Sequence, residues 1–421
     1  MKDDDRHEPR APAARIDETN MRTKRLLIYS HDTYGLGHIR RSLSIAGETV
    51  NGHDDVSALI VTGSPRCHAF GAPEGVDILK IPSVIKETGG GYRARSLNMS
   101  LEEILRLRAR LLIGAVQSFE PDVVLVDHSV VGVEGELLPL FDVLPAMKRR
   151  PTLVYGMRDI VDDAEVVRAE WTRLGAWRHI DQTYDKILVY GDDRVRTTAH
   201  DLDLQNRLPG KVEWTGYLGK QMPAGLGEDE TPYVLVCAGG GGDGQALISR
   251  YADFLESRPK TLPFRSVVVP GPFLSARRRR TLRDRLYDSG QPVRVIDFSD
   301  RMEELMAGAA CVISMGGYNA VVELLSCGKP AMLLPRERPR LEQWLRAERL
   351  APVTGFRICR GDDCSPKCFE TFIDDALSGR IARHDAVDLG GRARAAQALR
   401  LMMGAARPVR PVTGEPRLLV S

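Results

Sequence analysis

The sequence predicts an α/β protein with two parallel-sheet domains. From Lys24 onward, short β-branched runs alternate with stretches of helical periodicity, which is typical of βαβ units. After a glycine- and proline-rich stretch at residues 212–232, the same alternation begins again. A chain of 421 residues, 43% of them hydrophobic, is long enough to bury more than one core. We therefore expect two similar halves.

The first half contains six expected strands separated by helical or irregular segments. These strands are residues 24–30, 56–62, 76–82, 121–128, 151–157 and 185–191. A helix is expected over residues 100–119, because Ser100 and Glu103 form a capping box and apolar residues, Leu111 among them, recur on one face. The arginines of this helix are expected on its solvated side: Arg106, Arg108 and Arg110.

The second half repeats the pattern. Its expected strands are residues 233–237, 265–271, 293–299, 310–314 and 330–336. Asp300 and Glu303 predict a second capping box at the start of a helix. The expected organisation is a disordered tail at 1–21, an N-terminal domain at 22–216, a linker at 217–231, a C-terminal domain at 232–405 and a tail at 406–421.

Composition excludes several classes of function. Lys plus Arg number 59 against 57 Asp plus Glu, so the net charge of +2 gives no basis for a nucleic-acid partner. No apolar run approaches the roughly 18 residues of a spanning helix, and no secretory signal is expected. Seven scattered cysteines favour the cytoplasm over a disulfide framework. The cluster of Cys359, Cys364 and Cys368 matches no zinc spacing, so no metal is expected.

Glycine-rich loops follow the first strand of each half. Open parallel sheets bind ligands at the carboxyl ends of their strands, where helix N–H groups face outward. In the first half, Gly35 and Gly37 precede His38, which lies in the first helical turn. In the second half, Gly239, Gly240 and Gly241 can cradle phosphate oxygens with backbone amides.

A dinucleotide-dependent oxidoreductase is the first alternative, because Gly239, Gly241 and Gly244 match G-x-G-x-x-G. The ribose-binding acid expected at the end of the next strand is missing from residues 265–271. A P-loop is excluded, because no Gly-Lys pair is followed by Ser or Thr.

The segment 297–350 has the highest density of candidate ligand-binding residues. Gly316 and Gly317 open a helix whose N-terminus can hold a diphosphate without a metal. Glu323, within the first two turns, either accepts hydrogen bonds from two neighbouring hydroxyls or is an ordinary surface residue. Glu342 and Gln343 begin a later helix, where they either bind sugar hydroxyls or only decorate an amphipathic surface.

These motifs resemble a known family. "DFSDRMEELMAGAACVISMGGYNAVVELLSCGKPAMLLP…EQW" resembles the C-terminal domain of GT-B glycosyltransferases, in the family 28-like group that includes the lipid I N-acetylglucosaminyltransferase of peptidoglycan synthesis. "SHDTYGLGHIRRSLSIA" looks like the N-terminal loop of that group, and "YVLVCAGGGGDG" like its first C-terminal strand and loop. The whole pattern is most similar to an uncharacterised branch of predicted glycosyltransferases.

The resemblance implies two Rossmann-like domains facing each other across a cleft, with a nucleotide-sugar on the C-terminal half. It implies that Glu323 binds the ribose, Ser299 the base through its backbone, and Gln343 with Glu342 the donor sugar. The implied donor-binding set is Gly239, Gly240, Gly241, Ser299, Gly316, Gly317, Asn319, Glu323, Glu342 and Gln343. The acceptor motif of the lipid I enzyme is replaced by "VDHSVVGVEGELLP", so the acceptor is not inherited from that comparison.

Sugar transfer needs a base for the acceptor hydroxyl, and His38 is the leading candidate because imidazole titrates near neutrality. Its alternative is a histidine that only satisfies a backbone contact or binds substrate. Asp127 and His128, which end a strand, are the next acid/base candidates, followed by Asp32. Arg158 also ends a strand and is placed on the acceptor side with Gly35 and Gly37; a structural pair with Asp159 is the alternative.

We therefore expect an inverting, metal-independent transferase with no cofactor, which moves a hexose-type sugar from a UDP-sugar to an acceptor hydroxyl in cell-envelope or glycoconjugate biosynthesis. The acceptor is left open between a lipid carrier, which would bring this cytoplasmic protein to the inner face of the membrane, and a small glycoside. The alternatives are a nucleotide-sugar epimerase of the same architecture and a non-catalytic nucleotide-sugar-binding protein.

Overall fold

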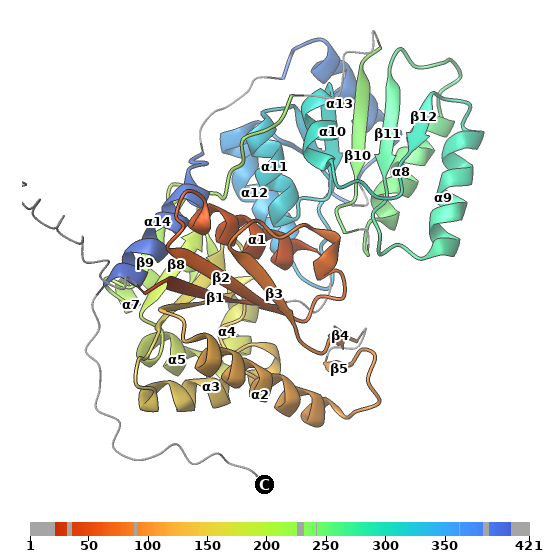
Figure 1. The fold of residues 1–421 in the computed structure, drawn as a ribbon. Helices are drawn as coiled ribbons and strands as arrows, with labels where there is room; N and C mark the ends of the chain where they lie inside the picture. Colours follow the sequence, from red (N-terminus) through yellow and green to blue (C-terminus); the bar gives the residue numbers. More distant parts are fainter. Residues whose placement is uncertain are drawn as a thin grey trace, which may run out of the picture.

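The computed structural model describes residues 22–31, 36–87, 91–224, 231–240, 242–361, 363–381 and 387–405. Both expected tails, at 1–21 and 406–421, lie outside the described residues. The described chain forms two parallel sheets flanked by helices (Figure 1). The expectation of two α/β halves is therefore confirmed.

The N-terminal sheet has seven strands in the order β3-β2-β1-β6-β7-β8-β9, all parallel. Its strands are β1 Lys24–Ser30, β2 Val56–Thr62, β3 Val76–Lys80, β6 Val123–Asp127, β7 Thr152–Arg158, β8 Lys186–Tyr190 and β9 Val212–Trp214. A separate antiparallel hairpin joins β4 Val84–Lys86 to β5 Tyr92–Ala94. In register, Ser30 pairs with Asp127 and Asp127 with Gly156, so the carboxyl ends of three neighbouring strands lie together.

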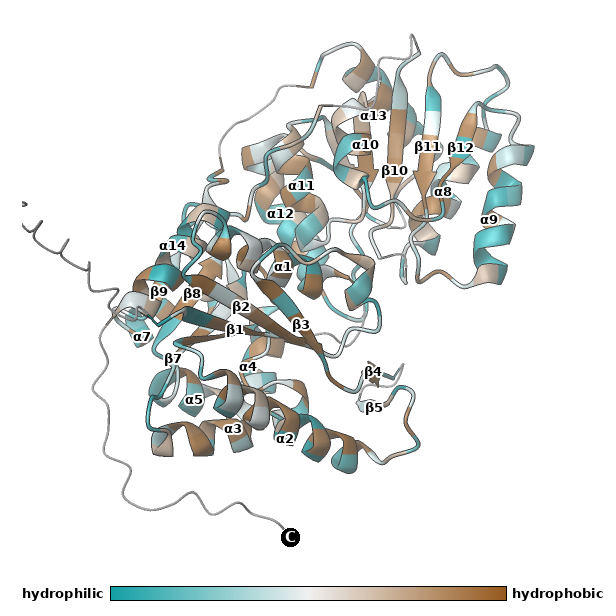
Figure 2. Cartoon of the chain, viewed as in Figure 1, coloured by the Kyte–Doolittle hydropathy of each residue, from teal (hydrophilic) through white to brown (hydrophobic). Residues whose placement is uncertain are grey.

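Helices cover both faces of this sheet, which explains why its strands are continuous apolar runs. The helices are α1 Gly37–Val50, α2 Leu101–Phe119, α3 Leu138–Val143, α4 Ala164–Arg173, α5 Ala176–Gln182, α6 Thr198–Asp201 and α7 Leu204–Arg207, with 3₁₀ turns η1 Cys67–Ala69, η2 Val133–Gly135 and η3 Leu144–Ala146. Leu26 and Ile28 of β1 share a core with α1, whereas Leu27 and Tyr29 share one with α2 and α3. Figure 2 shows the strands as the most hydrophobic part of the fold.

Helix α2 confirms one prediction and corrects another. Ser100 and Glu103 form the expected capping box. The expectation that Arg108 is solvated is wrong: it is fully buried and donates to Glu136, whose carboxylate also accepts from Tyr29 Oη at 2.5 Å. Leu111, expected on the buried face, is 38% exposed.

The C-terminal sheet has six parallel strands in the order β12-β11-β10-β13-β14-β15. Its strands are β10 Tyr233–Cys237, β11 Arg265–Val269, β12 Val293–Val295, β13 Cys311–Ser314, β14 Ala331–Leu333 and β15 Arg357–Ile358. Its helices are α8 Gln245–Glu256, α9 Ala276–Asp288, α10 Met302–Gly308, α11 Tyr318–Cys327, α12 Glu342–Thr354 and α13 Pro366–Leu377. The expected capping box at Asp300 and Glu303 is wrong: Ser299 Oγ accepts from the Arg301 amide instead, and α10 begins at Met302.

The last described helix, α14 Gly391–Gly404, crosses back to the N-terminal domain and packs on α1 (Figure 1). Arg394 Nε donates to the Thr215 carbonyl at 2.6 Å, and Arg400 Nη1 donates to the Glu48 carbonyl at 2.9 Å. By its contacts this helix belongs with the first sheet, although the sequence-based boundary at 405 groups it with the second. Across the described ranges, no helix has the length and apolar character needed to cross a membrane.

Candidate active site between the two domains

The N-terminal half of the site is built at the carboxyl ends of β1, β6 and β7. The strand pairing places Asp127 at the end of β6 beside Ser30 of β1 and Gly156 of β7. Helix α1 begins at Gly37 directly after β1, so His38 lies in its first turn, above the same edge of the sheet. The structure thus brings together the three expected acid/base residues, His38, Asp127 and His128.

His38 is held through one ring nitrogen. Its Nδ1 lies 2.7 Å from Asp127 Oδ2 and 2.8 Å from Arg41 Nη2. Arg41, which is buried, also donates to both carboxylate oxygens of Asp127, at 2.8 and 2.7 Å. An Nδ1–H tautomer donates to Asp127 and leaves Nε2 as an acceptor, whereas an Nε2–H tautomer accepts at Nδ1 from Arg41. The tautomer therefore decides whether His38 is able to remove a proton.

Charge and burial keep this histidine neutral. Burial, reinforced by the Arg41 charge, lowers the pKa of His38 to about 4, although the bond to Asp127 opposes the change. Burial favours the neutral carboxyl of Asp127, but Arg41 and His38 outweigh it and hold its pKa well below the usual range. At neutral pH the site therefore contains a neutral imidazole against an ionised Asp127–Arg41 pair.

Two further histidines lie beside His38. The ring centroids of His38 and His128 are 4.9 Å apart, and His31 lies 5.6 Å from His128 and 5.8 Å from His38. Burial lowers the pKa of both His31 and His128 well below its ordinary value. Among the described residues, the buried Nδ1 atoms of His31 and His128 accept or donate no hydrogen bond, and no group of His, Cys, Asp and Glu is arranged to hold a metal ion.

Arg158, at the end of β7, forms no ion pair among the residues that the structure describes, although the charges of Glu342 and Asp159 act on it. Its one hydrogen-bonding neighbour there is His128 Nε2, 3.5 Å from Nη2, and its buried Nε makes no hydrogen bond. Burial, followed by the charges of Arg41 and Arg346, lowers its pKa to about 10. The alternative of a structural pair with Asp159 is wrong, because Asp159 binds Arg346 instead.

This Asp159–Arg346 pair joins the two domains. Arg346 of α12 is fully buried and donates from Nε and Nη2 to Asp159 at 2.9–3.1 Å. Its remaining donors bind two carbonyls, those of Ile160 at 3.0 Å and Gly316 at 3.2 Å. One side chain therefore fixes the end of β7 against the loop that precedes α11.

The C-terminal half of the site consists of loops after β10, β12 and β13. Gly239 and Gly316 adopt left-handed backbone conformations, with φ of 60° and 83°, which side chains disfavour. Gly317 caps α11, so the first N–H groups of this helix face the interdomain cleft. Gly240 and Ser299 line the same cleft. Two predicted glycines, Gly35 and Gly241, and the candidate Asp32 lie outside the described residues.

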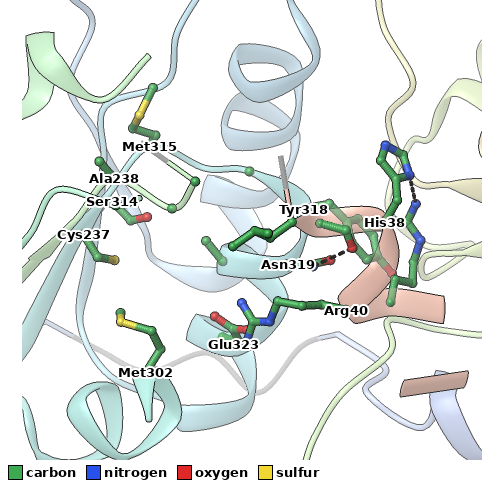
Figure 3. Close-up of a pocket in the computed structure, with 18 of the residues that line it drawn as sticks. His38, Arg40, Cys237, Ala238, Met302, Ser314, Met315, Tyr318, Asn319 and Glu323 are labelled. Carbon is green, nitrogen blue, oxygen red and sulfur yellow. Dashed lines mark hydrogen bonds and ion pairs between the residues drawn. The ribbon is translucent and has the colours of Figure 1, made fainter. Parts of the chain in front are cut away.

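Glu323 is buried in α11 and faces the N-terminal domain across the cleft (Figure 3). Its Oε1 accepts from Arg40 Nη2 at 2.6 Å, and Arg40 also donates to Glu303 at 3.0 Å. Lys220 Nζ lies 2.8 Å from Glu303 and 3.8 Å from Glu323. Burial raises the pKa of Glu323, against the opposing charges of Arg40 and Lys220. Sequence reasoning missed Arg40, Lys220 and Glu303.

The remaining predicted residues also line the cleft. Asn319 donates from its amide to the Gly37 carbonyl at 2.9 Å, which connects α11 to the start of α1 (Figure 3). Arg336 donates to Glu342, and Gln343 Oε1 accepts from the Arg336 amide at 3.2 Å. Both expected sugar-binding side chains are therefore positioned by the segment after β14.

Two cavities meet at His38. The first, about 630 Å³, lies between the domains and is lined by the glycine loops, Ser299 and Glu323. The second, about 480 Å³, extends from His38 over the N-terminal domain, past His128 towards α4. Both volumes lie in the range of ~300–1,000 Å³ that is typical of small-molecule sites. His38 and Arg158 line both cavities, so a group bound in one adjoins a group bound in the other.

Comparison with known proteins agrees with this arrangement. Residues 275–382 match the glycosyltransferase family 28 C-terminal domain. The chain is 21% identical over 318 residues, which are 71% of this chain and 75% of the relative, to the UDP-N-acetylglucosamine--N-acetylmuramyl-(pentapeptide) pyrophosphoryl-undecaprenol N-acetylglucosamine transferase of Leuconostoc citreum. A relative from Leuconostoc mesenteroides with the same name is 23% identical over 317 residues, which are 71% of this chain and 76% of the relative.

Solved structures share the fold. MurG of Acinetobacter baumannii superposes with a TM-score of 0.54 at 12% identity, covering 91% of this chain and all of that one. The UDP-GlcNAc 2-epimerase of Neisseria meningitidis superposes with a TM-score of 0.56 at 15% identity, covering 90% of this chain and 99% of that one. The two domains therefore form a GT-B fold, as the sequence predicts.

Proposed function

We propose that this chain, a GT-B glycosyltransferase with a family 28 C-terminal domain, transfers a hexose-type sugar from a UDP-sugar to an acceptor hydroxyl with inversion and without a metal. One observation carries the proposal. A neutral His38, held by Asp127, stands where the cavity of the glycine loops meets a second cavity. A transferase needs its base at such a junction, because the base must reach a hydroxyl that faces the donor sugar.

The proposed donor lies along the C-terminal loops. Glu323 accepts the ribose hydroxyls, Ser299 contacts the base through its backbone, and Glu342 with Gln343 binds the sugar. The diphosphate lies at the N-terminus of α11, near Gly316 and Gly317, where helix N–H groups stabilise negative charge. The leaving group is then neutralised by backbone dipoles, which is why no metal is required in the proposal.

The reaction is a single displacement. The acceptor oxygen forms a bond to the anomeric carbon while the bond from that carbon to the diphosphate oxygen breaks, and the electron pair leaves with UDP. His38 Nε2 takes the hydroxyl proton, and Asp127 stabilises the resulting imidazolium through Nδ1–H. His128 lies next to the same hydroxyl position and orients it. Attack from the face opposite the leaving group inverts the anomeric configuration.

An epimerase of the same fold acts on the donor alone and needs no acceptor site. The second cavity at His38 therefore favours transfer. A non-catalytic binding protein would not require a base held by a buried carboxylate. These alternatives become outcomes of the following experiment.

The experiment is calorimetric titration of UDP, GDP, ADP and NAD in EDTA, with wild type and Glu323→Gln. We expect UDP to bind, and the substitution to weaken it at least about tenfold, because charged hydrogen bonds contribute ~1.5–3 kcal/mol. Glu304→Gln is the matched control, because Glu304 lies on the neighbouring helix and pairs with Arg301 at the surface.

Binding of NAD alone, or of none of the four, would refute the proposal. Incubation with UDP-N-acetylglucosamine alone tests the epimerase: an epimerised product without an acceptor would replace transfer by epimerisation. Full activity of His38→Gln would remove His38 as the base.

A further inference from the structure

We propose that the second cavity recognises an acceptor that carries an anionic group, a phosphate or a carboxylate, next to the hydroxyl that receives the sugar, and that Arg158 binds this group. The inference deepens the proposed function, because it rests on the second cavity being the acceptor site. It gives a role to the positive charge of Arg158 in this cavity, which the proposed donor binding does not use.

Every carboxylate that lines the cavity already has a cationic partner. Glu87 pairs with Arg93 at 3.4 Å, Glu134 with Arg173 at 2.8 Å, Glu170 with Arg340 at 3.2 Å, Asp243 with Arg336 at 2.7 Å, and Glu342 with Arg336. These pairs also occupy two of the lining cations. Arg336 serves two of the five carboxylates, so the charge of Glu342 also acts on Arg158. None of the five forms an ion pair with Arg158 among the described residues.

Two lining cations remain without a carboxylate in the described part of the chain. Arg158 lies at the junction with the donor cavity and has only His128 Nε2 at 3.5 Å. Lys86 of β4 also lines the cavity and is exposed, with its Nζ 5.9 Å from the centre of the Tyr92 ring. The lining of the cavity also includes apolar side chains, among them Val131, Val161 and Trp171.

A guanidinium that forms no ion pair and lies next to other cations is costly, and a bound anion relieves that cost. Arg158 lies near two arginines that are already satisfied, because Arg41 binds Asp127 and Arg346 binds Asp159. His31 and His128 add imidazoles whose Nδ1 atoms make no hydrogen bond within the described chain. The planar guanidinium of an arginine such as Arg158 binds a carboxylate or a phosphate through two oxygens.

Position links this anion site to the reaction. Arg158 and His38 line both cavities, and His128 contacts Arg158 while its ring lies 4.9 Å from that of His38. An anion on Arg158 therefore places its neighbouring hydroxyl beside His38. The other cation without an ion pair, Lys86, takes a second charge or another part of the same acceptor.

The test uses the full chain saturated with UDP and follows binding of glucose 6-phosphate, glucuronic acid and methyl glucoside by ligand-observed NMR. We expect at least one anionic sugar to bind at least about tenfold more tightly than the neutral glycoside. The phosphate and the carboxylate probes distinguish the two sources of charge. Inorganic phosphate should displace the bound anion from wild type, a result that depends on no substitution.

Arg158→Gln should abolish the preference for the anion, and Lys86→Gln should weaken it less. Arg110→Gln is the control, because Arg110 is exposed on α2 and lines neither cavity. Retained UDP binding shows that each variant is folded. Equal affinity for neutral and anionic sugars, or a preference that survives Arg158→Gln, overturns the inference while the proposed function stands. Failure of the wild-type chain to bind UDP refutes the proposed function instead.

Discussion

Substitution of Arg41 by Met should raise the pKa of His38. The guanidinium of Arg41 lies 2.8 Å from His38 Nδ1 and binds both oxygens of Asp127. In wild type, burial and this positive charge lower the pKa of His38 to about 4. Without Arg41, the buried carboxylate of Asp127 keeps only the His38 imidazole as a side-chain partner within the described chain, so the protonated ring is stabilised.

The expected size of the pKa shift follows from the loss of Arg41 as a partner of Asp127. An opposite charge at hydrogen-bond distance typically moves a pKa by ~1–3 units. An upward shift of about two units takes His38 from a pKa of about 4 to about 6. At pH 5 the neutral fraction then falls from about nine tenths to about one tenth, whereas at pH 8 it stays near one. The ratio of activities at these two pH values should therefore fall roughly tenfold in the variant.

The assay combines two measurements. NMR titration of chain labelled at the histidine rings, with His38→Gln for assignment, reports the pKa and the tautomer directly. The slow release of UDP from the donor, with water as acceptor, gives the pH profile without knowledge of the natural acceptor. A ratio of rates at two pH values cancels any difference in the amount of folded enzyme.

The lowered pKa of His38 also predicts how the stability of the fold depends on pH. His38 is neutral in the folded chain down to about pH 4, whereas the unfolded chain binds its proton near 6.5. The stability that this group contributes is therefore complete above about pH 6.5 and falls by up to ~3 kcal/mol as the pH decreases to about 4. A wild-type His38 that titrates near its ordinary value, or an unchanged titration in Arg41→Met, would refute the reasoning.

Three further substitutions test the packing that positions the site. Arg346→Met should lower the free energy of unfolding by ~3–5 kcal/mol, because it leaves the charge of Asp159 buried and unpaired between the domains. Urea unfolding measures this loss. Glu136→Gln should cost a similar amount through the unpaired, fully buried Arg108, seen as a lower midpoint of thermal unfolding. Gly391→Ala should cost ~1–3 kcal/mol or more, because its Cβ would meet the backbone of the interdomain segment; proteolysis near α14 should accelerate.

Matched controls accompany these substitutions. Glu102→Gln removes a carboxylate from an exposed pair on α2 and should leave the thermal midpoint unchanged. Gly404→Ala adds a Cβ to the same helix as Gly391, at a position with open space around it, and should not accelerate proteolysis. A loss below about 1 kcal/mol in Arg346→Met would contradict the role of its ion pair in holding the domains together.

The fold was predictable because its signals are local. The apolar runs at residues 24–30 and 233–237 become central strands because both faces of each sheet are covered. The capping box of α2 needs only residues three apart. The sequence pattern places Arg108 at the surface because its partner, Glu136, lies 28 positions away in a different segment. Periodicity alone does not reveal such a partner.

Contacts between residues that are far apart in the sequence are even more important in the candidate site. His38 and Glu323 were predictable as candidates because each stands near the start of a helix that follows a strand. The contact of Arg40 with Glu323 was not, since the two residues are separated by 283 positions and belong to different domains. A pair of arginines on an amphipathic helix is usually solvated. Here Arg41 binds Asp127 of its own domain, and the approach of the second domain gives Arg40 its partners, Glu303 and Glu323.

The first turns of α1 connect the chemistry to the arrangement of the domains. His38 and Arg41 bind Asp127 within the N-terminal domain, whereas Arg40, between them, binds Glu323 and Glu303 of the C-terminal domain. Any movement that separates the domains by more than the reach of one side chain must break the Arg40 contacts. The same movement carries the imidazole away from the α11 N-terminus, because His38 and Arg40 share one helical turn. His38 therefore faces the glycine loops of the C-terminal domain only in the arrangement in which Glu323 is also paired. Under the proposed function, a donor that binds Glu323 must exchange with Arg40 without opening the cleft.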